Sequence, residues 1–333
     1  MKKLLAVLSA AAVLLSFTGC SKKSDGKSDA KKTKIGIAKI VQHVALDSVE
    51  QGIMDAVKDA GIDADYDLQN ANGDIATANQ IANQYLTEKV DVAVGIATPV
   101  AVALANTIKD KPVVFATITD PVGAGLVSTL EHGEGNVTGM SDAIPTVEHI
   151  KTFASLTGIK TLGYIYTSSE ANSISGLKLV EEGCKEAGLN LVTQSISTSA
   201  EVITAAQAIV NRVDGIYLTT DNTVFSALSS LVQVFADAKK PIFSGDVTGA
   251  LNGGIFMASG FDYYKAGYAT GKMVVDILNG AKPSELPVKF MTDPSDSELL
   301  FDLDAAANCS ISIPEEWLSK ANIIIQNGQT TRK

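Results

Sequence analysis

The chain repeats one alternation of short apolar strands and amphipathic helices in its two halves, and this repeat restricts the folds available to its 333 residues. Three predicted strands recur at offsets of 127, 123 and 129 residues, in pairs that begin at Lys34 and Thr161, Asp91 and Asp214, and Pro112 and Pro241. Alternating strands and helices build parallel sheets covered by helices, and a steady period indicates a repeated unit. The sequence therefore predicts an α/β fold with two Rossmann-like lobes.

The predicted helices carry apolar residues at helical spacing. In residues 45–60, for example, Leu46, Val49 and Ile53 fall on one face. Further helices are predicted at residues 99–109, 173–187, 224–238 and 264–278. Pro145 interrupts the pattern where we expect the chain to cross between lobes. The predicted N-terminal lobe comprises residues 34–145 plus about 263–290, and the C-terminal lobe 146–262 plus about 291–333.

The predicted strands end in hydroxyl, amide or acid side chains. These polar clusters are Gln42–His43, Thr98, Thr119–Asp120, Ser168–Glu170, Thr219–Asn222 and Ser244–Asp246. Ligands of parallel α/β sheets bind at the carboxyl ends of the strands. Because such ends occur in both halves, we predict a binding cleft between two hinged lobes.

The charge balance limits what this cleft can bind. The chain has 27 basic and 37 acidic residues, which argues against a nucleic-acid partner. Its only arginines are Arg212 and Arg332, neither near a predicted strand end of the cleft. A buried anion would therefore depend on hydroxyls, backbone N–H groups and helix N-termini. This combination favours a small zwitterion such as an α-amino acid, while a sugar or nucleoside remains an alternative.

Several of these polar residues also have a purely structural interpretation. Thr98 could cap the helix after it or, with the free N–H groups there, bind a ligand carboxylate. Asp120 could belong to a turn, and Asp221 could cap a helix. Asp246 is followed by no convincing helix, so we expect it to pair with a ligand ammonium group. His43 is a candidate for a ligand hydrogen bond.

The N-terminus predicts export and lipidation. Lys2 and Lys3 precede an apolar run over residues 4–15, too short to span a bilayer. Small residues then precede Cys20, as in a bacterial lipoprotein, although Phe17 replaces the usual leucine. We predict a signal peptide at 1–19, a lipid on Cys20 and a flexible tether at 20–33.

The sequence lacks the common catalytic and metal-binding motifs. It has no phosphate loop, metalloprotease helix or nucleophile elbow. Its three histidines have no metal-ligand spacing around them, so we expect neither metal nor cofactor. An enzyme would need a pair such as His43 with Ser169 across the cleft. We expect a binding protein instead.

The strand-end motifs resemble those of one family, the substrate-binding lipoproteins of ABC importers associated with tryptophan, tyrosine and phenylalanine. The similar segments lie within about residues 34–293 and are 42–47, 97–99, 115–122, 135–139, 169–173, 220–222 and 260–264. The resemblance implies a type I periplasmic-binding-protein fold that encloses its ligand when the lobes close. It also implies a monomer outside the cytoplasm, in the periplasm or at the cell surface, that serves a permease and an ATPase. A sensor of the same fold is the alternative.

The resemblance also suggests roles for individual residues. It places the ligand carboxylate near Thr98 and Thr119 and the ligand amino group near Asp246. The second-lobe polar loops correspond to Glu170, Asn172, Ser173, Thr220, Asp221 and Asn222. Family members often carry glutamate where this chain has Gln42. Pocket walls could come from Tyr166, Phe261, Tyr263 or Tyr264.

Overall fold

The computed structural model of the chain describes residues 32–333. The predicted signal peptide, the lipidation site Cys20 and nearly all of the predicted tether lie outside these residues. Among the described residues, no helix is both long and apolar enough to cross a membrane. Cys184 is buried in a helix, and both it and Cys309 are free thiols.

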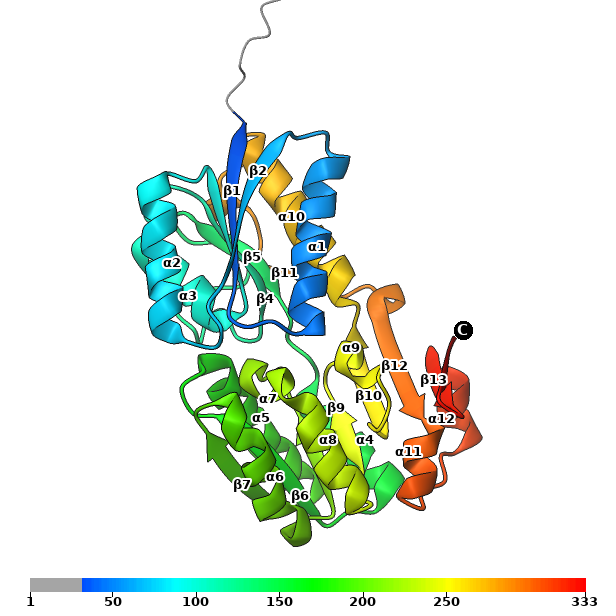
Figure 1. Cartoon of the computed structure of the whole chain (residues 1–333). Helices are drawn as coiled ribbons and strands as arrows, with labels where there is room; N and C mark the ends of the chain where they lie inside the picture. Colours follow the sequence, from blue (N-terminus) through cyan, green and yellow to red (C-terminus); the bar gives the residue numbers. More distant parts are fainter. Residues whose placement is uncertain (1–31) are drawn as a thin grey trace, which may run out of the picture. The chain divides into compact units, whose positions relative to one another are not determined.

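The first sheet has six parallel strands in the order β11-β5-β4-β3-β1-β2. Three helices of the first half and one from late in the chain accompany it (Figure 1). Its elements are β1 (Thr33–Lys39), α1 (Val44–Asp59), β2 (Ala64–Asn70), α2 (Ile75–Glu88), β3 (Val92–Ile96), α3 (Thr98–Thr107), β4 (Val113–Ile118), β5 (Val137–Ser141), α10 (Tyr263–Leu278) and β11 (Lys289–Phe290). Helix α4 (Thr146–Thr157) follows β5 in the chain and packs on the second half.

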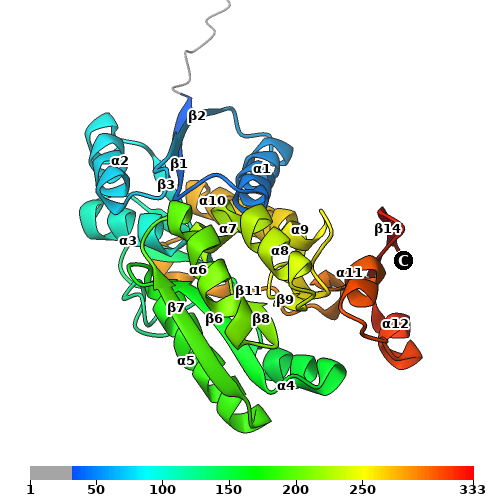
Figure 2. The same cartoon turned by 60° about the horizontal axis from the view of Figure 1, so that its bottom comes forward.

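The second sheet has eight strands in the order β14-β13-β12-β10-β9-β8-β6-β7. It is parallel except at β10–β12 and β13–β14. Its elements are β6 (Thr161–Thr167), α5 (Ala171–Ala187), β7 (Asn190–Ile196), α6 (Val202–Ile209), β8 (Gly215–Leu218), α7 (Asn222–Ser226), α8 (Leu228–Asp237), β9 (Ile242–Ser244), α9 (Val247–Ala250), β10 (Met257–Phe261), β12 (Ser297–Asp302), α11 (Leu303–Asn308), α12 (Glu315–Lys320), β13 (Ile323–Gln326) and β14 (Gln329–Arg332). Figure 2 places α11 and α12 beside the C-terminal strands.

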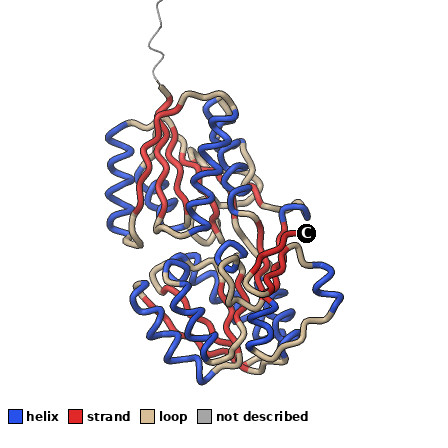
Figure 3. Tube along the Cα trace, turned by 45° about the vertical axis from the view of Figure 1, so that its right-hand side comes forward, coloured by secondary structure: helices blue, strands red, loops and turns tan. Residues whose placement is uncertain are grey.

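The two sheets, the first parallel and the second mostly parallel, confirm the predicted α/β class, and Figure 3 shows their strands in red. We call the parts built on the six-stranded and eight-stranded sheets the first and second lobes. The chain passes between the sheets after β5, after β10 and after β11. Asp142 follows β5 and Tyr263 begins α10, so both lie beside a crossing. The predicted residue boundaries of the lobes stay a prediction.

Helix α10 returns from the second lobe to pack against α1, and glycines allow the two backbones to touch (Figure 1). A Cβ atom on Gly267 would lie 2.2 Å from the carbonyl oxygen of Val49. One on Gly52 would lie 2.3 Å from the carbonyl oxygen of Tyr264. Such distances are far below van der Waals contact, so only glycine fits at these positions. This contact holds the late helix on the first sheet.

The predicted helix over residues 224–238 is wrong as a single element. The structure has α7 and α8 instead, separated at Ala227, whose φ of −123° is not helical. Near this break the Ser226 hydroxyl donates to the carbonyl of Thr223, so a side chain bonds a carbonyl of the preceding turn. No proline or glycine marks the position, and periodicity alone could not locate it.

We expect Gly267→Ala to destabilise the protein by about 1–3 kcal/mol, because the added methyl group forces α1 and α10 apart. Alanine's higher helix propensity, worth about 1 kcal/mol, offsets only part of this cost. Urea denaturation would measure the change. Lys272→Ala, an exposed substitution in the same helix, should leave the midpoint nearly unchanged. Equal stability of Gly267→Ala and wild type would contradict the close-packing argument.

Candidate functional site

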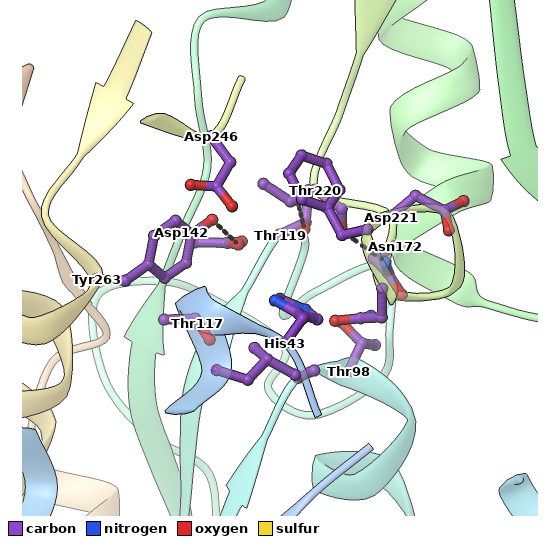
Figure 4. A pocket seen from close by; sticks show the side chains of 14 residues that line it. His43, Thr98, Thr117, Thr119, Asp142, Asn172, Thr220, Asp221, Asp246 and Tyr263 are labelled. Atoms are coloured by element: carbon purple, nitrogen blue, oxygen red, sulfur yellow. Dashed lines mark hydrogen bonds between the residues drawn. The ribbon is translucent and has the colours of Figure 1, made fainter. Parts of the chain in front are cut away.

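A small cavity of about 20 Å³ lies where the carboxyl ends of the two sheets face each other (Figure 4). We call it the inner cavity. Both lobes contribute to its lining, which consists of His43, Leu46, Ala97, Thr98, Thr117, Thr119, Asp142, Asn172, Thr220, Asp221, Asn222, Phe225, Asp246 and Tyr263. Each lobe thus supplies loops that follow its own parallel strands.

Most of the residues predicted for the site line this cavity. The eight that do so are His43, Thr98, Thr119, Asn172, Thr220, Asp221, Asn222 and Asp246. Asp120, Glu170 and Ser173 do not line it. Of the aromatic residues suggested as walls, Tyr263 alone lines it. Ser169, the serine considered for an enzyme, is exposed and outside the cavity.

Two buried carboxyl groups, Asp142 and Asp246, face the inner cavity (Figure 4). Burial raises the pKa of each to about 6. The Tyr263 hydroxyl donates to Asp142 over 3.3 Å, while the other carboxylate oxygen of Asp142 has no partner among the described residues. Among the residues that the structure describes, no lysine or arginine lines the cavity. The pair therefore favours a cationic group of a ligand.

The structure corrects the interpretation of Asp246. This residue does cap a helix, because its carboxylate accepts a hydrogen bond of 2.6 Å from the backbone N–H of Thr248, at the start of α9. The helix has only four residues, which is why the sequence pattern did not reveal it. Capping and lining the cavity are compatible, since a carboxylate has two oxygen atoms.

Neutral groups of the first lobe line another part of the cavity. Thr98 is the first residue of α3, and Ala97 is its N-cap without a side-chain hydrogen bond. The alternative that Thr98 merely caps the helix is therefore wrong. The N-terminal N–H groups of α3 have no partners within the helix and attract negative charge. This end of the cavity is suited to a carboxylate.

Two non-glycine residues with positive φ lie at this same end. Ala97 has φ of 73° and Thr117 has φ of 55°, both uncommon for residues with a side chain. The register between β4 and β5 shifts between Phe115 and Ile118, which places Thr117 in an irregularity of the strand. Strained backbone of this kind concentrates at binding sites, where the surrounding structure maintains it.

Buried acids of the second lobe organise its polar loops. Asp221 accepts hydrogen bonds from the Thr167 backbone and hydroxyl and from the Ser173 hydroxyl. It also accepts one from the backbone N–H of Val224 and thereby caps helix α7. The capping interpretation of Asp221 is confirmed. Its carboxylate oxygens are thus engaged within the lobe, and Ser173 contributes by holding Asp221 rather than by lining the cavity.

Glu170 is likewise a supporting residue and does not line the inner cavity, contrary to the sequence prediction. Its carboxylate accepts hydrogen bonds from the side-chain amides of Asn172 and Asn222 and from Thr223. Burial, with a further contribution from nearby Asp221, raises the pKa of Glu170. These bonds orient the two asparagines that do line the cavity.

Direct hydrogen bonds also join the lobes. The hydroxyls of Thr119 and Thr220 are 3.0 Å apart. Asp120, predicted to bind ligand, instead accepts a hydrogen bond of 2.9 Å from Ser175 in α5 and another from the backbone of Gly123. The turn interpretation of Asp120 therefore describes its local role, and its second oxygen connects the lobes.

His43 and Phe225 contact each other from opposite lobes, with ring centroids 6.0 Å apart. Burial lowers the pKa of His43 to about 4, so its imidazole is neutral at physiological pH. The Nε2 atom of His43 is buried and has no partner among the described residues. It remains available to a ligand.

Six lining residues were absent from the predicted site: Leu46, Ala97, Thr117, Asp142, Phe225 and Tyr263. Asp142 directly follows strand β5, so it is a polar residue at a strand end like the predicted ones. It was missed because β5 was not among the strands predicted from the sequence. Tyr263 was considered only as a wall. Nothing local distinguishes Phe225 from a core residue, because its position depends on the break at Ala227.

Comparisons with known proteins give a consistent result. Residues 34–325 match the family described as ABC transporter substrate binding protein. The chain is 35% identical over 320 residues to a tyrosine-binding protein of Clostridioides difficile, covering 91% of each chain. It is also similar to the solved ABC domain of Streptococcus pneumoniae in complex with L-Trp, with 34% identity, a TM-score of 0.83, and coverage of 88% of this chain and 100% of that one.

A ligand-free, open structure of a Clostridium difficile substrate-binding protein with adhesive properties is 32% identical. Its TM-score is lower, 0.63, and it covers 85% of this chain and 96% of that chain. Solute-binding proteins at 16–17% identity, with TM-scores of 0.60–0.62, share the fold alone. These neighbours confirm the predicted type I periplasmic-binding-protein fold.

We expect Asp246→Asn to raise the free energy of unfolding of the ligand-free protein at pH 7.5. The folded-state pKa of Asp246 lies above its ordinary value, so ionisation destabilises the fold as pH rises from about 4 to 6. Removing the charge should increase the free energy of unfolding by up to about 3 kcal/mol. Asparagine retains an oxygen that can accept the capping hydrogen bond from the backbone N–H of Thr248.

Denaturation curves at pH 7.5 and pH 4 would test this expectation, and most of the gain should vanish at pH 4. Asp221→Asn is the matched control, since both oxygens of Asp221 accept hydrogen bonds and the amide cannot replace them all. That variant should be destabilised. A loss of stability in Asp246→Asn at pH 7.5 would contradict the argument.

Proposed function

The chain belongs to the family of ABC transporter substrate-binding proteins, and we propose that it captures a single aromatic amino acid and delivers it to a membrane permease. The observation that carries the proposal is the polarity of the inner cavity. Two buried carboxyl groups, Asp142 and Asp246, lie in it, and no cationic side chain of residues 32–333 does. A ligand that brings its own ammonium group supplies the missing charge.

The ammonium group would bind at Asp142 and Asp246. An ammonium ion favours the ionised form of both carboxyls, whose pKa values burial has raised to about 6. The ligand carboxylate would lie at the N-terminus of α3, near Thr98 and Thr119. Hydroxyls and free backbone N–H groups there compensate a negative charge without an arginine.

The remaining lining supports an aromatic side chain. Leu46, Phe225 and Tyr263 offer apolar and aromatic surface, and neutral His43 adds a ring with an unpaired nitrogen. Tilted and edge-to-face contacts stabilise an aromatic ring in addition to the burial of its apolar surface. The tyrosine-binding relative and the tryptophan complex support the same ligand class.

Lobe closure would retain the ligand. A ligand with contacts in both lobes favours the closed arrangement by the difference in its binding free energy between the two states. The Thr119–Thr220 and Asp120–Ser175 hydrogen bonds add direct contacts between the lobes. The higher TM-score with the tryptophan complex than with the open structure, at similar identity, supports assigning the described structure to the closed arrangement.

We expect Asp246→Ala to weaken binding of the preferred aromatic amino acid by at least about 30-fold, because the ammonium group loses a buried charged partner worth 2 kcal/mol or more. Asp120→Ala should weaken it by only about fivefold, since it removes one hydrogen bond between the lobes. Calorimetry on wild type and both variants measures the difference. Equal affinity of Asp246→Ala and wild type would remove Asp246 from the site, and no heat with tryptophan, tyrosine or phenylalanine would refute the ligand class.

We further propose that the protein acts outside the cytoplasm as a monomer, anchored by a lipid on Cys20 and joined to it by the tether of residues 20–33. Globomycin blocks the signal peptidase of lipoproteins. It should therefore cause the unprocessed precursor to accumulate, visible as a larger band on an immunoblot. Cys20→Ser should abolish lipid labelling. Normal processing in the presence of globomycin would contradict the anchor.

A further inference from the structure

A second hollow adjoins the inner cavity. We call it the outer groove; its volume is about 550 Å³. Residues of both lobes line it: Gln42, His43, Val44, Ala45, Phe225, Ser226, Leu228, Ser229, Val232, Gln233, Ala236, Asp246, Gly249, Asn252, Gly253 and Gly254. Three of them, His43, Phe225 and Asp246, also line the inner cavity. These three residues therefore lie at the boundary between the two spaces.

The aromatic contact at this boundary separates the spaces. Phe225 comes from α7 of the second lobe and His43 precedes α1 of the first, and their rings are in tilted contact. Phe225 is 7% exposed, so its ring occupies the boundary rather than solvent. We therefore expect a smaller side chain at this position to connect the two spaces.

The backbone near Phe225 provides room for its ring. A Cβ atom added to Gly249 would lie 3.1 Å from Cε1 of Phe225 and 2.7 Å from Cδ2 of Leu228. The glycine thus accommodates the phenylalanine on the side of the outer groove. His43 of the first lobe contacts the same ring, so both lobes hold the Phe225 side chain.

The two spaces differ in which end of a ligand they can receive. Asp246 lines both of them, whereas Ala97, Thr98, Thr117 and Thr119 line only the inner cavity. In the proposed binding mode the amino group lies at Asp246 and the carboxylate lies near Thr98. The amino end of the ligand therefore faces the outer groove, and the carboxyl end does not.

We infer that Phe225 limits the ligand to a single amino acid by closing the inner cavity against the outer groove, an inference that rests on the proposed function. The groove has the chemistry to hold one further small residue, added at the amino end. Ser226, Ser229, Gln233 and Asn252 offer neutral hydrogen-bonding groups for a peptide unit, and Asp246 remains within the groove for its ammonium. The rejected ligand class is thus a dipeptide whose C-terminal residue is aromatic.

Calorimetry with tyrosine, Gly-Tyr and Tyr-Gly on the full folded domain tests the inference. Wild type should bind tyrosine and bind both dipeptides at least 100-fold more weakly. Phe225→Ala should bind Gly-Tyr at least tenfold more tightly than wild type does, while its affinity for tyrosine falls. The affinity for Tyr-Gly should not increase in this variant. Its additional residue lies at the carboxyl end of tyrosine, and the residues of the outer groove do not line that part of the inner cavity.

Two variants serve as controls. Val232→Ala changes a side chain that lines only the outer groove and should leave all three affinities as in wild type. Phe225→Leu keeps an apolar side chain and serves as the test if Phe225→Ala fails to fold. Its increase in affinity for Gly-Tyr should be smaller but measurable.

Each other outcome has a defined meaning. The inference is overturned if the Phe225 variants bind tyrosine yet gain nothing for Gly-Tyr, or if wild type binds Gly-Tyr within tenfold of tyrosine. It is also overturned if Gly-Tyr and Tyr-Gly gain equally, since the groove would then not select the amino end. Failure of wild type to bind any aromatic amino acid refutes the proposed function itself, and the inference with it.

Discussion

The site depends on the burial of two acids, Asp142 and Asp246, without a cation beside them. Each is at most 3% exposed, and burial raises the pKa of each to about 6. In an aqueous loop such groups would be ordinary ionised carboxylates; here their ionisation opposes folding. The protein thus keeps an unfavourable electrostatic arrangement, which a ligand ammonium would relieve in the proposed binding mode. Affinity for a cationic group and a cost to the ligand-free fold have the same origin.

Other acids of the second lobe have the opposite role. Asp221 and Glu170 are as deeply buried, but protein donors satisfy their oxygens. Glu170 holds the side-chain amides of Asn172 and Asn222, and Asp221 caps the helix that begins at Asn222. Burial alone therefore does not identify a binding acid. One oxygen of Asp142 has no hydrogen-bond partner among the described residues, whereas both oxygens of Asp221 accept hydrogen bonds.

The sequence predicted the fold well because periodicity and strand ends are local signals. Strands β1, β3, β4, β6, β8 and β9 lie where the pattern placed them, within a few residues. The strand-end rule also located eight lining residues, His43 and Asp246 among them. It failed where a strand was not delimited, as for Asp142. It could not separate Glu170 and Ser173, which support the site, from Asn172, which lines it, since all three follow the same strand.

The sequence by itself determined that two parallel sheets present polar loops to each other and that no arginine serves those loops, because residue type and periodicity are properties of the chain alone. Only the tertiary structure decided which acids face the cavity, which ones are satisfied inside a lobe, and that Asp120 joins the lobes. It also placed Phe225 against His43 across the boundary of two spaces. The physical reason is that side-chain direction, burial and hydrogen-bond partners arise from contacts between residues distant in sequence, and local patterns do not contain that information.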